Sequence, residues 1–289
     1  MKIKCYAKIN LSLDVTGKTE NGYHKLDSIF QLVSVYDILD LSVSEGEGIY
    51  LTCNNPEIPC DEKNIAYRAG KLFLEYSGIK AKIIMHIEKN IPFGAGMGGG
   101  SADGAGVLYA LNKLLNCSYS NQELRNLAVK LGADVPFFLV GGTALAQGIG
   151  EVLTELKPLQ KIPLVILKGK ESISTPQAYQ AIDKLKNPVH PDTKAMLQAI
   201  AIQDKNLLCQ SCANLFELAI SCQDVIRAKK ALLAHGAKCA VMTGSGSAVF
   251  GIFENENSAK VCAEKLKQDF IFAQVCFTEE KNFIQIEGV

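Results

Sequence analysis

The sequence predicts an α+β protein with two domains, a mixed α/β domain at residues 1–158 and a ferredoxin-like domain at residues 159–289. Three observations support this prediction. The first half places a glycine-rich loop among segments with strand and helix patterns, and a polar, proline-bearing stretch at 155–163 follows it. Beyond that stretch the predicted order is β-α-β-β-α-β, the split arrangement of ferredoxin-like domains. A chain of 289 residues also has room for two domains of about 150 residues each.

The first ninety residues are predicted to form mainly strands. Residues 3–15 and 29–44 are rich in Ile, Leu, Val and Tyr with partial alternation, which is typical of strands. A helix is predicted over 64–76, where apolar residues recur at helical spacing, and Gly78 provides its stop signal. A further strand is predicted over 82–88.

The glycine-rich segment 92–102 leads into apolar residues at steps of three and four, so it is predicted to open a helix. A second helix is predicted after Ser120, because Ser120 and Glu123 form a capping box. Residues 137–140 and 143–147 are then predicted to form a β-hairpin around two glycines.

The second half alternates shorter apolar runs with helical patterns. We expect strands at 164–167, 239–242, 248–253 and 271–277, helices between 176 and 235, and a helix at 258–268.

Composition excludes several classes of function. Lys plus Arg number 30 and Asp plus Glu number 30, so the chain has no broad positive field to hold nucleic acid. No stretch reaches the roughly 18 to 20 uninterrupted apolar residues that span a bilayer. The charged N-terminus does not resemble a secretory signal, and we expect a cytoplasmic protein with reduced cysteines, the Cys209-x-x-Cys212 pair included.

The glycine loop predicts a phosphate site. Six glycines between Gly94 and Gly104 leave backbone amides unshielded by side chains, and the following helix adds the partial positive charge of its N-terminus. A flexible linker is the simpler alternative, but linkers do not usually lie between an apolar strand and a well-patterned helix.

The known phosphate-binding motifs do not fit this loop. A dinucleotide-binding fold requires an acidic residue about 20 positions beyond its glycines. Residues 105–122 contain no Asp or Glu, so this motif does not fit. The Walker A pattern requires a lysine, and none lies between Lys89 and Lys113. A nucleotide triphosphate held largely by backbone amides remains, and the first domain is predicted to bind it.

The loop resembles the P-x-x-x-G-L-G-S-S-S-A loop of the GHMP kinases, the superfamily of galactokinase, homoserine kinase and mevalonate kinase. Four further motifs match in the expected order, and the triple glycine before Ser101 is most similar to the branch that acts on cytidine diphosphate methylerythritol. Unlike the usual pattern, Ala102 replaces a second serine. The four motifs are Ala7-Lys8-Ile9-Asn10-Leu11, Gly22-Tyr23-His24, Gly132-Ala133-Asp134-Val135-Pro136 and Thr243-Gly244-Ser245-Gly246.

The resemblance implies transfer of the ATP γ-phosphoryl group to the 2-hydroxyl of the methylerythritol moiety of cytidine diphosphate methylerythritol, with Mg²⁺ required. It implies Asp134 as the general base, Lys8 as its charged partner, Ser101 as a ligand of Mg²⁺ and Lys89 as a residue near the adenine. The expected ATP-binding residues are Lys89, Pro92, Phe93, Gly94, Ala95, Gly96, Met97, Gly98, Gly99, Gly100, Ser101 and Ala102.

The same resemblance implies a pocket for the small-molecule substrate. Tyr23, His24 and Tyr179 match the residues that hold cytosine, whereas Asn10 and Asn64 match donors to the methylerythritol diphosphate portion. The expected substrate-binding residues are Asn10, Tyr23, His24, Asn64, Thr175, Tyr179, Gly244 and Ser245.

Two other functions stay open at this point. A homoserine, mevalonate or phosphomevalonate kinase would share the glycine loop but would lack the cytidine pocket. The motif at 22–24 together with residues 175–179 favours the presence of that pocket. A non-catalytic nucleotide-binding protein would have no need of Lys8 and Asp134. No nucleic-acid or membrane partner is expected, and the chain is expected to be a monomer or a weak homodimer.

Overall fold

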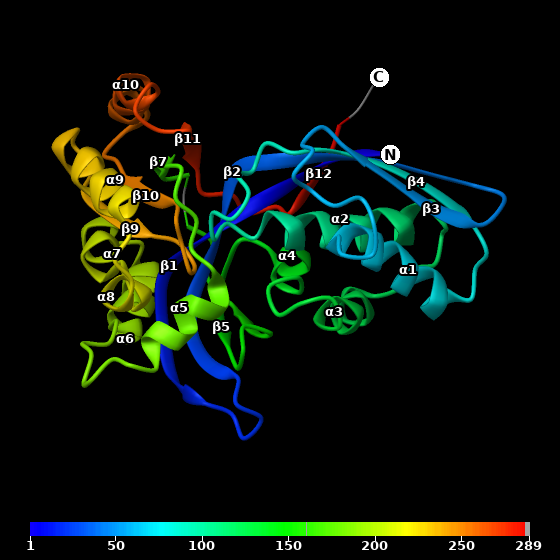
Figure 1. Cartoon of the computed structure of the whole chain (residues 1–289), viewed down its shortest axis with the longest axis horizontal. Helices are drawn as coiled ribbons and strands as arrows, with labels where there is room; N and C mark the ends of the chain where they lie inside the picture. Colours follow the sequence, from blue (N-terminus) through cyan, green and yellow to red (C-terminus); the bar gives the residue numbers. More distant parts are fainter. Residues whose placement is uncertain (160, 287–289) are drawn as a thin grey trace.

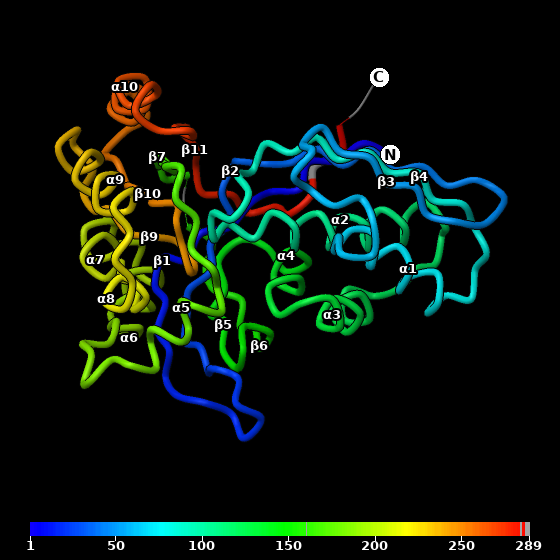
Figure 2. The backbone as a smooth tube through the Cα atoms, viewed as in Figure 1, coloured from blue at the N-terminus to red at the C-terminus, as the bar shows by residue number. Residues whose placement is uncertain are grey.

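The computed structural model describes residues 1–159 and 161–286. Its two longest elements are a pair of antiparallel strands (Figure 1). β1 (Lys2–Lys18) and β2 (His24–Ser44) confirm the strands predicted in this region; β1 is longer at both ends and β2 begins earlier than predicted. They pair antiparallel from Lys2 opposite Asp40 to Lys18 opposite His24, with register shifts after Tyr6, Asn10 and Val15. Figure 2 shows this hairpin running from the large sheet past the smaller one.

The large sheet has the order β12-β1-β2-β4-β3, and β5, β6 and β8 pair at its sides. One face is covered by helices, as Figure 1 shows below β3 and β4. The strands are β3 (Gly48–Cys53), β4 (Lys82–Glu88), β5 (Thr143–Gln147), β6 (Val152–Glu155), β8 (Ala213–Asn214) and β12 (Phe283–Gln285), and the helices are α1 (Ile65–Ser77), α2 (Gly99–Leu114), α3 (Asn121–Val129) and α4 (Phe137–Val140).

Local signals set the ends of these helices. The Asn64 side chain accepts a hydrogen bond from the amide of Ala66 at 2.8 Å, and Gly78 ends α1 in the left-handed conformation with φ of 69°. The predicted capping box of Ser120 and Glu123 is confirmed at the start of α3. Side-chain caps therefore explain where α1 and α3 begin, whereas α2 begins after Gly98 without one.

The predicted hairpin at 137–147 is half wrong. Residues 143–147 form β5, but 137–140 form the short helix α4, and β5 pairs with β2 and β6 instead. Pro136 has a helical φ of −59°, and the side chains of Phe137 and Phe138 are buried in the core. A four-residue apolar run has no period that separates a strand from a buried helical turn.

The second half forms the smaller sheet in the order β11-β7-β10-β9, which confirms the ferredoxin-like arrangement. Helices α9 and α10 pack on one of its faces, whereas Leu164, Ile166 and Phe250 on the other face share a core with Ile9 and Leu11 of β1. The elements are β7 (Pro163–Lys168), α5 (Thr175–Ile182), α6 (Thr193–Ile202), α7 (Lys205–Ser211), α8 (Phe216–Ala219), α9 (Gln223–Ala234), β9 (Cys239–Met242), β10 (Val249–Ile252), α10 (Glu256–Leu266) and β11 (Phe272–Phe277).

Two short strands from the second half join the large sheet. β8 pairs parallel with β1 at Ser12 and Leu13, and β12 pairs antiparallel with β1 from Ile3 to Cys5. The division of the chain at 158 and 159 stays a prediction. Among the described residues, no helix combines the length and the apolar character needed to cross a membrane.

Candidate active site

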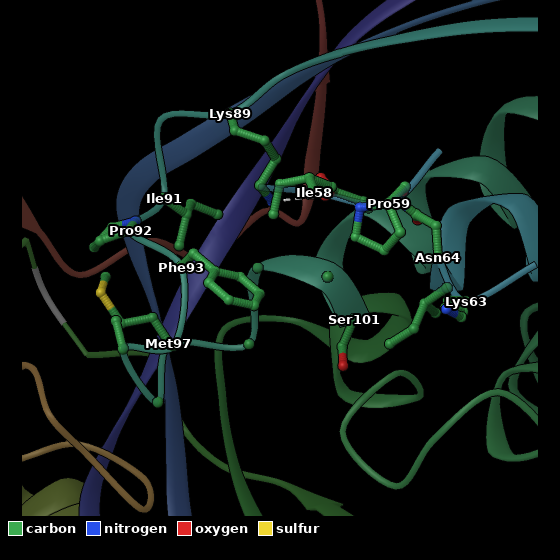
Figure 3. Close-up of a pocket in the computed structure, with 18 residues that line it drawn as sticks. Ile58, Pro59, Lys63, Asn64, Lys89, Ile91, Pro92, Phe93, Met97 and Ser101 are labelled. Atoms are coloured by element: carbon green, nitrogen blue, oxygen red, sulfur yellow. Dashed lines mark hydrogen bonds and ion pairs between the residues drawn. The ribbon is translucent and has the colours of Figure 1, made fainter. Parts of the chain in front are cut away.

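The glycine loop between β4 and α2 forms one wall of a cavity of about 450 Å³. Gly96 and Gly98 adopt positive φ values of 74° and 72°, which few other residues tolerate. Figure 3 shows Ile58, Pro59, Lys63 and Asn64 on one side of the cavity, Ile91, Phe93 and Met97 on the other, and Ser101 beneath them. Apolar side walls above a row of bare amides suit a flat heterocycle that carries phosphates.

A second cavity of about 340 Å³ lies next to the first and draws its lining from both halves of the chain. Gly96, Gly98 and Ser101 line both cavities, so the two spaces meet at the glycine loop. The expected site residues that line the second cavity are Lys8, Asn10, Gly96, Gly98, Ser101, Asp134, Thr175, Tyr179, Gly244 and Ser245.

Lys8 and Asp134 face each other in the second cavity. Lys8 Nζ lies 3.4 Å from Asp134 Oδ2 and 2.8 Å from Asn10 Oδ1, and it stands 4.4 Å from the centre of the Phe30 ring. The Lys8 backbone amide also donates to the carbonyl of Met97 at 3.0 Å, which ties β1 to the glycine loop. The buried ammonium therefore has a fixed position beside a carboxylate.

Asn10 lines this cavity, but its side chain contacts other protein groups. Its Oδ1 accepts from Lys8 Nζ and from the amide of Gly244 at 2.9 Å, and its Nδ2 donates to Ser28 Oγ at 2.9 Å. The expected contact of Asn10 with substrate stays a prediction. The structure adds a bridge from the lysine to the Gly244 loop, which the sequence pattern does not reveal.

The expected aromatic residues are arranged differently from a sandwich around a base. Tyr179 lines the second cavity, and its ring stacks on His24 with centres 4.5 Å apart and planes at 22°. The His24 Nε2 atom pairs with Asp183 Oδ1 at 2.8 Å, and Tyr23 is 63% exposed. Neither Tyr23 nor His24 lines the cavity, whereas Tyr179 does so together with Phe216, whose ring it meets edge to face with centres 5.0 Å apart.

Thr175 and Ser245 meet at the opening of the same cavity. Their hydroxyl oxygens are 2.8 Å apart, so the start of α5 contacts the loop after β9. Burial, with a smaller contribution from the charge of Asp134, raises the pKa of Tyr179 to about 12. The phenol therefore stays protonated at neutral pH.

Lys89 lines the first cavity but is held by two carboxylates. Its ammonium bonds to Asp37 and, at 2.7 Å, to Asp103, and Asp37 also accepts from the amide of Ile91 at 2.8 Å. Burial alone would lower the pKa of Lys89, but the charges of Asp103 and Asp37 outweigh it and raise that pKa. Burial raises the pKa of Asp103 to about 7, against the opposing charge of Lys89.

Asp37 and Asp103 were not expected in the site. The signal for Asp103 was its place as the one charge in a run of Gly, Ala and Ser at the start of a predicted helix. Asn64 was expected near the substrate, yet it lines the first cavity because it caps α1 beside the glycine loop. Within the described ranges, no cluster of three or more His, Cys, Asp or Glu side chains could hold a metal ion.

Comparison with known proteins supports one family. Residues 64–142 match the GHMP kinases N terminal domain, and residues 196–271 match the GHMP kinases C terminal model. A 4-diphosphocytidyl-2-C-methyl-D-erythritol kinase from Clostridium tetani is 42% identical over 93% of this chain and 97% of that protein. The chain belongs to the 4-diphosphocytidyl-2-C-methyl-D-erythritol kinase family.

Solved structures agree with this family. A crystal structure of 4-(cytidine 5'-diphospho)-2C-methyl-D-erythritol kinase matches with a TM-score of 0.80 and 34% identity, covering 96% of this chain and 99% of that one. Homoserine kinase from Cytophaga hutchinsonii has the same TM-score at 20% identity, covers 99% of this chain and 97% of its own, and shows the fold alone.

Membership of the diphosphocytidyl-methylerythritol kinases confirms the expected kinase and its GHMP fold. A kinase of this family uses ATP on a small-molecule acceptor, in agreement with the cavities on either side of the glycine loop. The names of these relatives favour this enzyme over the other GHMP kinases and over a non-catalytic protein.

Proposed function

We propose that this protein transfers the γ-phosphoryl group of ATP to the 2-hydroxyl of 4-diphosphocytidyl-2-C-methyl-D-erythritol. The observation that supports the proposal most is the meeting of two cavities at Gly96, Gly98 and Ser101, with Lys8 and Asp134 facing the second cavity. ATP bound in the first cavity would present its terminal phosphate to an alcohol bound in the second.

Asp134 is the proposed general base. Its side chain is 34% exposed and lines the second cavity, so it can accept the hydroxyl proton as the new oxygen–phosphorus bond forms and the bond to the β-phosphate breaks. Lys8 would orient this carboxylate and offset charge that develops on the moving phosphoryl group. Asn10 and Phe30 hold Lys8 in place.

The residues at the glycine loop fit a bound Mg²⁺. Mg²⁺ takes one or two protein ligands, and phosphate oxygens and waters complete its shell. Ser101 supplies one hydroxyl where the two cavities meet, which agrees with the lack of a larger acidic cluster in the described part of the chain. When bound, Mg²⁺ would neutralise charge on the phosphates, and the loop amides would hold their oxygens.

The nucleoside end of the acceptor is assigned to Tyr179. The Tyr179 ring lines the second cavity and can stack on cytosine, and the hydroxyls of Thr175 and Ser245, beside Gly244, can donate to the diphosphate. We also propose that the enzyme acts in the cytoplasm as a monomer or weak homodimer.

The test is ADP release from Mg²⁺-ATP with 4-diphosphocytidyl-2-C-methyl-D-erythritol, beside homoserine, mevalonate and phosphomevalonate as competing acceptors. Turnover with the cytidylyl acceptor alone, and a product mass increased by one phosphoryl group, is the expected result. Turnover with another acceptor would contradict the assignment of the cytidine pocket but would still show a kinase. No ADP release with any of the four acceptors would favour the non-catalytic function.

A further inference from the structure

Thr243 follows β9 and is fully buried between the two halves of the site. Its Oγ1 accepts a hydrogen bond from the backbone amide of Asn10 at 3.0 Å, and the same hydroxyl lies 3.3 Å from both Asn10 Oδ1 and the carbonyl oxygen of Gly96. Thr243 lines neither cavity. One hydroxyl thus joins strand β1, the glycine loop and the loop after β9.

The backbones of those two loops are in direct contact at this point. A Cβ atom added to Gly96 would overlap the carbonyl oxygen of Thr243, and one added to Gly244 would lie 2.8 Å from the carbonyl oxygen of Gly96. Asn214 Nδ2 also donates to the carbonyls of Met242 at 2.7 Å and Gly244 at 2.8 Å. The relative position of the loops is therefore fixed by close packing and directed hydrogen bonds.

The groups around Thr243 belong to both cavities. Gly96 lines both cavities, Gly244 lines the second, and Asn10 accepts the hydrogen bond that fixes the Lys8 ammonium. Phosphoryl transfer needs the attacking oxygen, the phosphorus and the leaving oxygen in line, and a displacement of about 1 Å can lower the rate about 100-fold. Thr243 is placed to control this alignment without touching either ligand.

We propose that Thr243 is a positioning residue, which holds the nucleotide loop and the acceptor loop in register for in-line transfer. The proposal depends on the kinase activity proposed above. It predicts a loss in turnover rather than in substrate affinity, because the contacts lining each cavity are kept while their relative position changes.

The experiment compares Thr243→Val and Thr243→Ala, which lack the hydroxyl, with Thr243→Ser, which keeps it. Thr143→Val is the matched control: Thr143 is also buried, and its hydroxyl donates to Gln31 Oε1 at 2.6 Å, but it lines neither cavity. We expect kcat to fall about 10- to 100-fold in the valine and alanine variants, with KM for ATP and for the acceptor changed less than about 3-fold. Thr243→Ser and Thr143→Val should stay near the wild-type kcat.

Melting temperatures measured on the same samples separate positioning from stability, and the alanine variant serves if the valine variant does not fold. Turnover of either hydroxyl-free variant equal to that of Thr143→Val would overturn the proposal, as would a serine variant as slow as valine. The wild-type rate on each acceptor tests the proposed function separately. Activity on a different acceptor with an impaired valine variant would overturn only the substrate assignment.

Discussion

Lys8 and Asp134 are 3.4 Å apart but differ in environment, since the Lys8 side chain is 5% exposed and that of Asp134 is 34% exposed. The buried ammonium is stabilised by Asn10 and by the Phe30 ring as well as by the carboxylate. Asp134 keeps an open side toward the second cavity. This asymmetry suits a fixed positive charge beside a carboxylate that must meet a substrate hydroxyl.

Replacing Asp134 with Asn should lower turnover by about 10² to 10⁴, because the amide keeps the size of the side chain but cannot accept the hydroxyl proton. Affinity for ATP should stay unchanged, since Asp134 does not line the first cavity. The measurement is steady-state kcat together with nucleotide binding by calorimetry. Asp40→Asn, at an exposed position of β2, is the control, and near-wild-type turnover of Asp134→Asn would remove the assignment.

Replacing Gly96 with Ala should weaken ATP binding at least about 10-fold. Gly96 has a φ of 74° and its added Cβ would overlap Thr243, whereas Gly78 has a φ of 69° with nothing within 4 Å of an added Cβ. Gly78→Ala therefore isolates the cost of the backbone conformation, about 1 kcal/mol, from the cost of the clash. Equal nucleotide affinity in the two variants, measured by calorimetry, would show that the loop contact does not matter.

The Asp103 carboxyl should make the protein less stable as pH rises. Burial raises the pKa of Asp103 from 3.8 to about 7, so the folded chain binds this proton more tightly than the unfolded chain. The stabilising effect of this bound proton is complete below pH 4 and is lost as pH rises from about 4 to about 7. Asp103→Asn should reduce this decline in the free energy of unfolding, measured with urea at pH 5, 6, 7 and 8. A difference between wild type and variant that stays constant with pH would contradict the expectation.

Removing the ring of Tyr179 should raise KM for the cytidylyl acceptor. Stacking on a base contributes about 1 to 3 kcal/mol, so Tyr179→Ala should increase KM about 5- to 150-fold, while Tyr179→Phe keeps the ring and should stay near wild type. Tyr109→Ala is the matched control, because Tyr109 also stacks on a neighbouring ring, that of Phe283 at 5.0 Å. An equal effect on KM for ATP would indicate general loss of structure instead of a lost base contact.

The sequence was informative wherever a local signal sets the structure. The glycine loop, the capping box at Ser120 and the β-α-β-β-α-β order of elements in the second half were all predicted from patterns of a few residues. The short helix at 137–140 was missed because its burial comes from tertiary packing. Asn64 lines the first cavity, a position that depends on how α1 packs beside α2, and its contact with substrate stays a prediction.

The contacts that join distant segments were beyond sequence patterns. Asp37 meets Lys89 across β2 and β4, and Thr243 meets Gly96 across the two halves of the chain. The sequence around one residue of such a pair contains no signal that identifies the other residue. A resemblance to a family names motifs in order, but it does not say which hydrogen bonds hold them together.

The pairing of β12 with β1 affects the protein during its synthesis. The backbone edge of β1 between Ile3 and Cys5 is translated about 280 residues before its partner at Phe283–Gln285. Until then this edge offers unpaired amides and carbonyls to any other extended chain. This edge of the nascent chain therefore stays open to aggregation until β12 has been made, and deleting Phe283–Gln285 should reduce soluble yield more than the loss of three residues suggests.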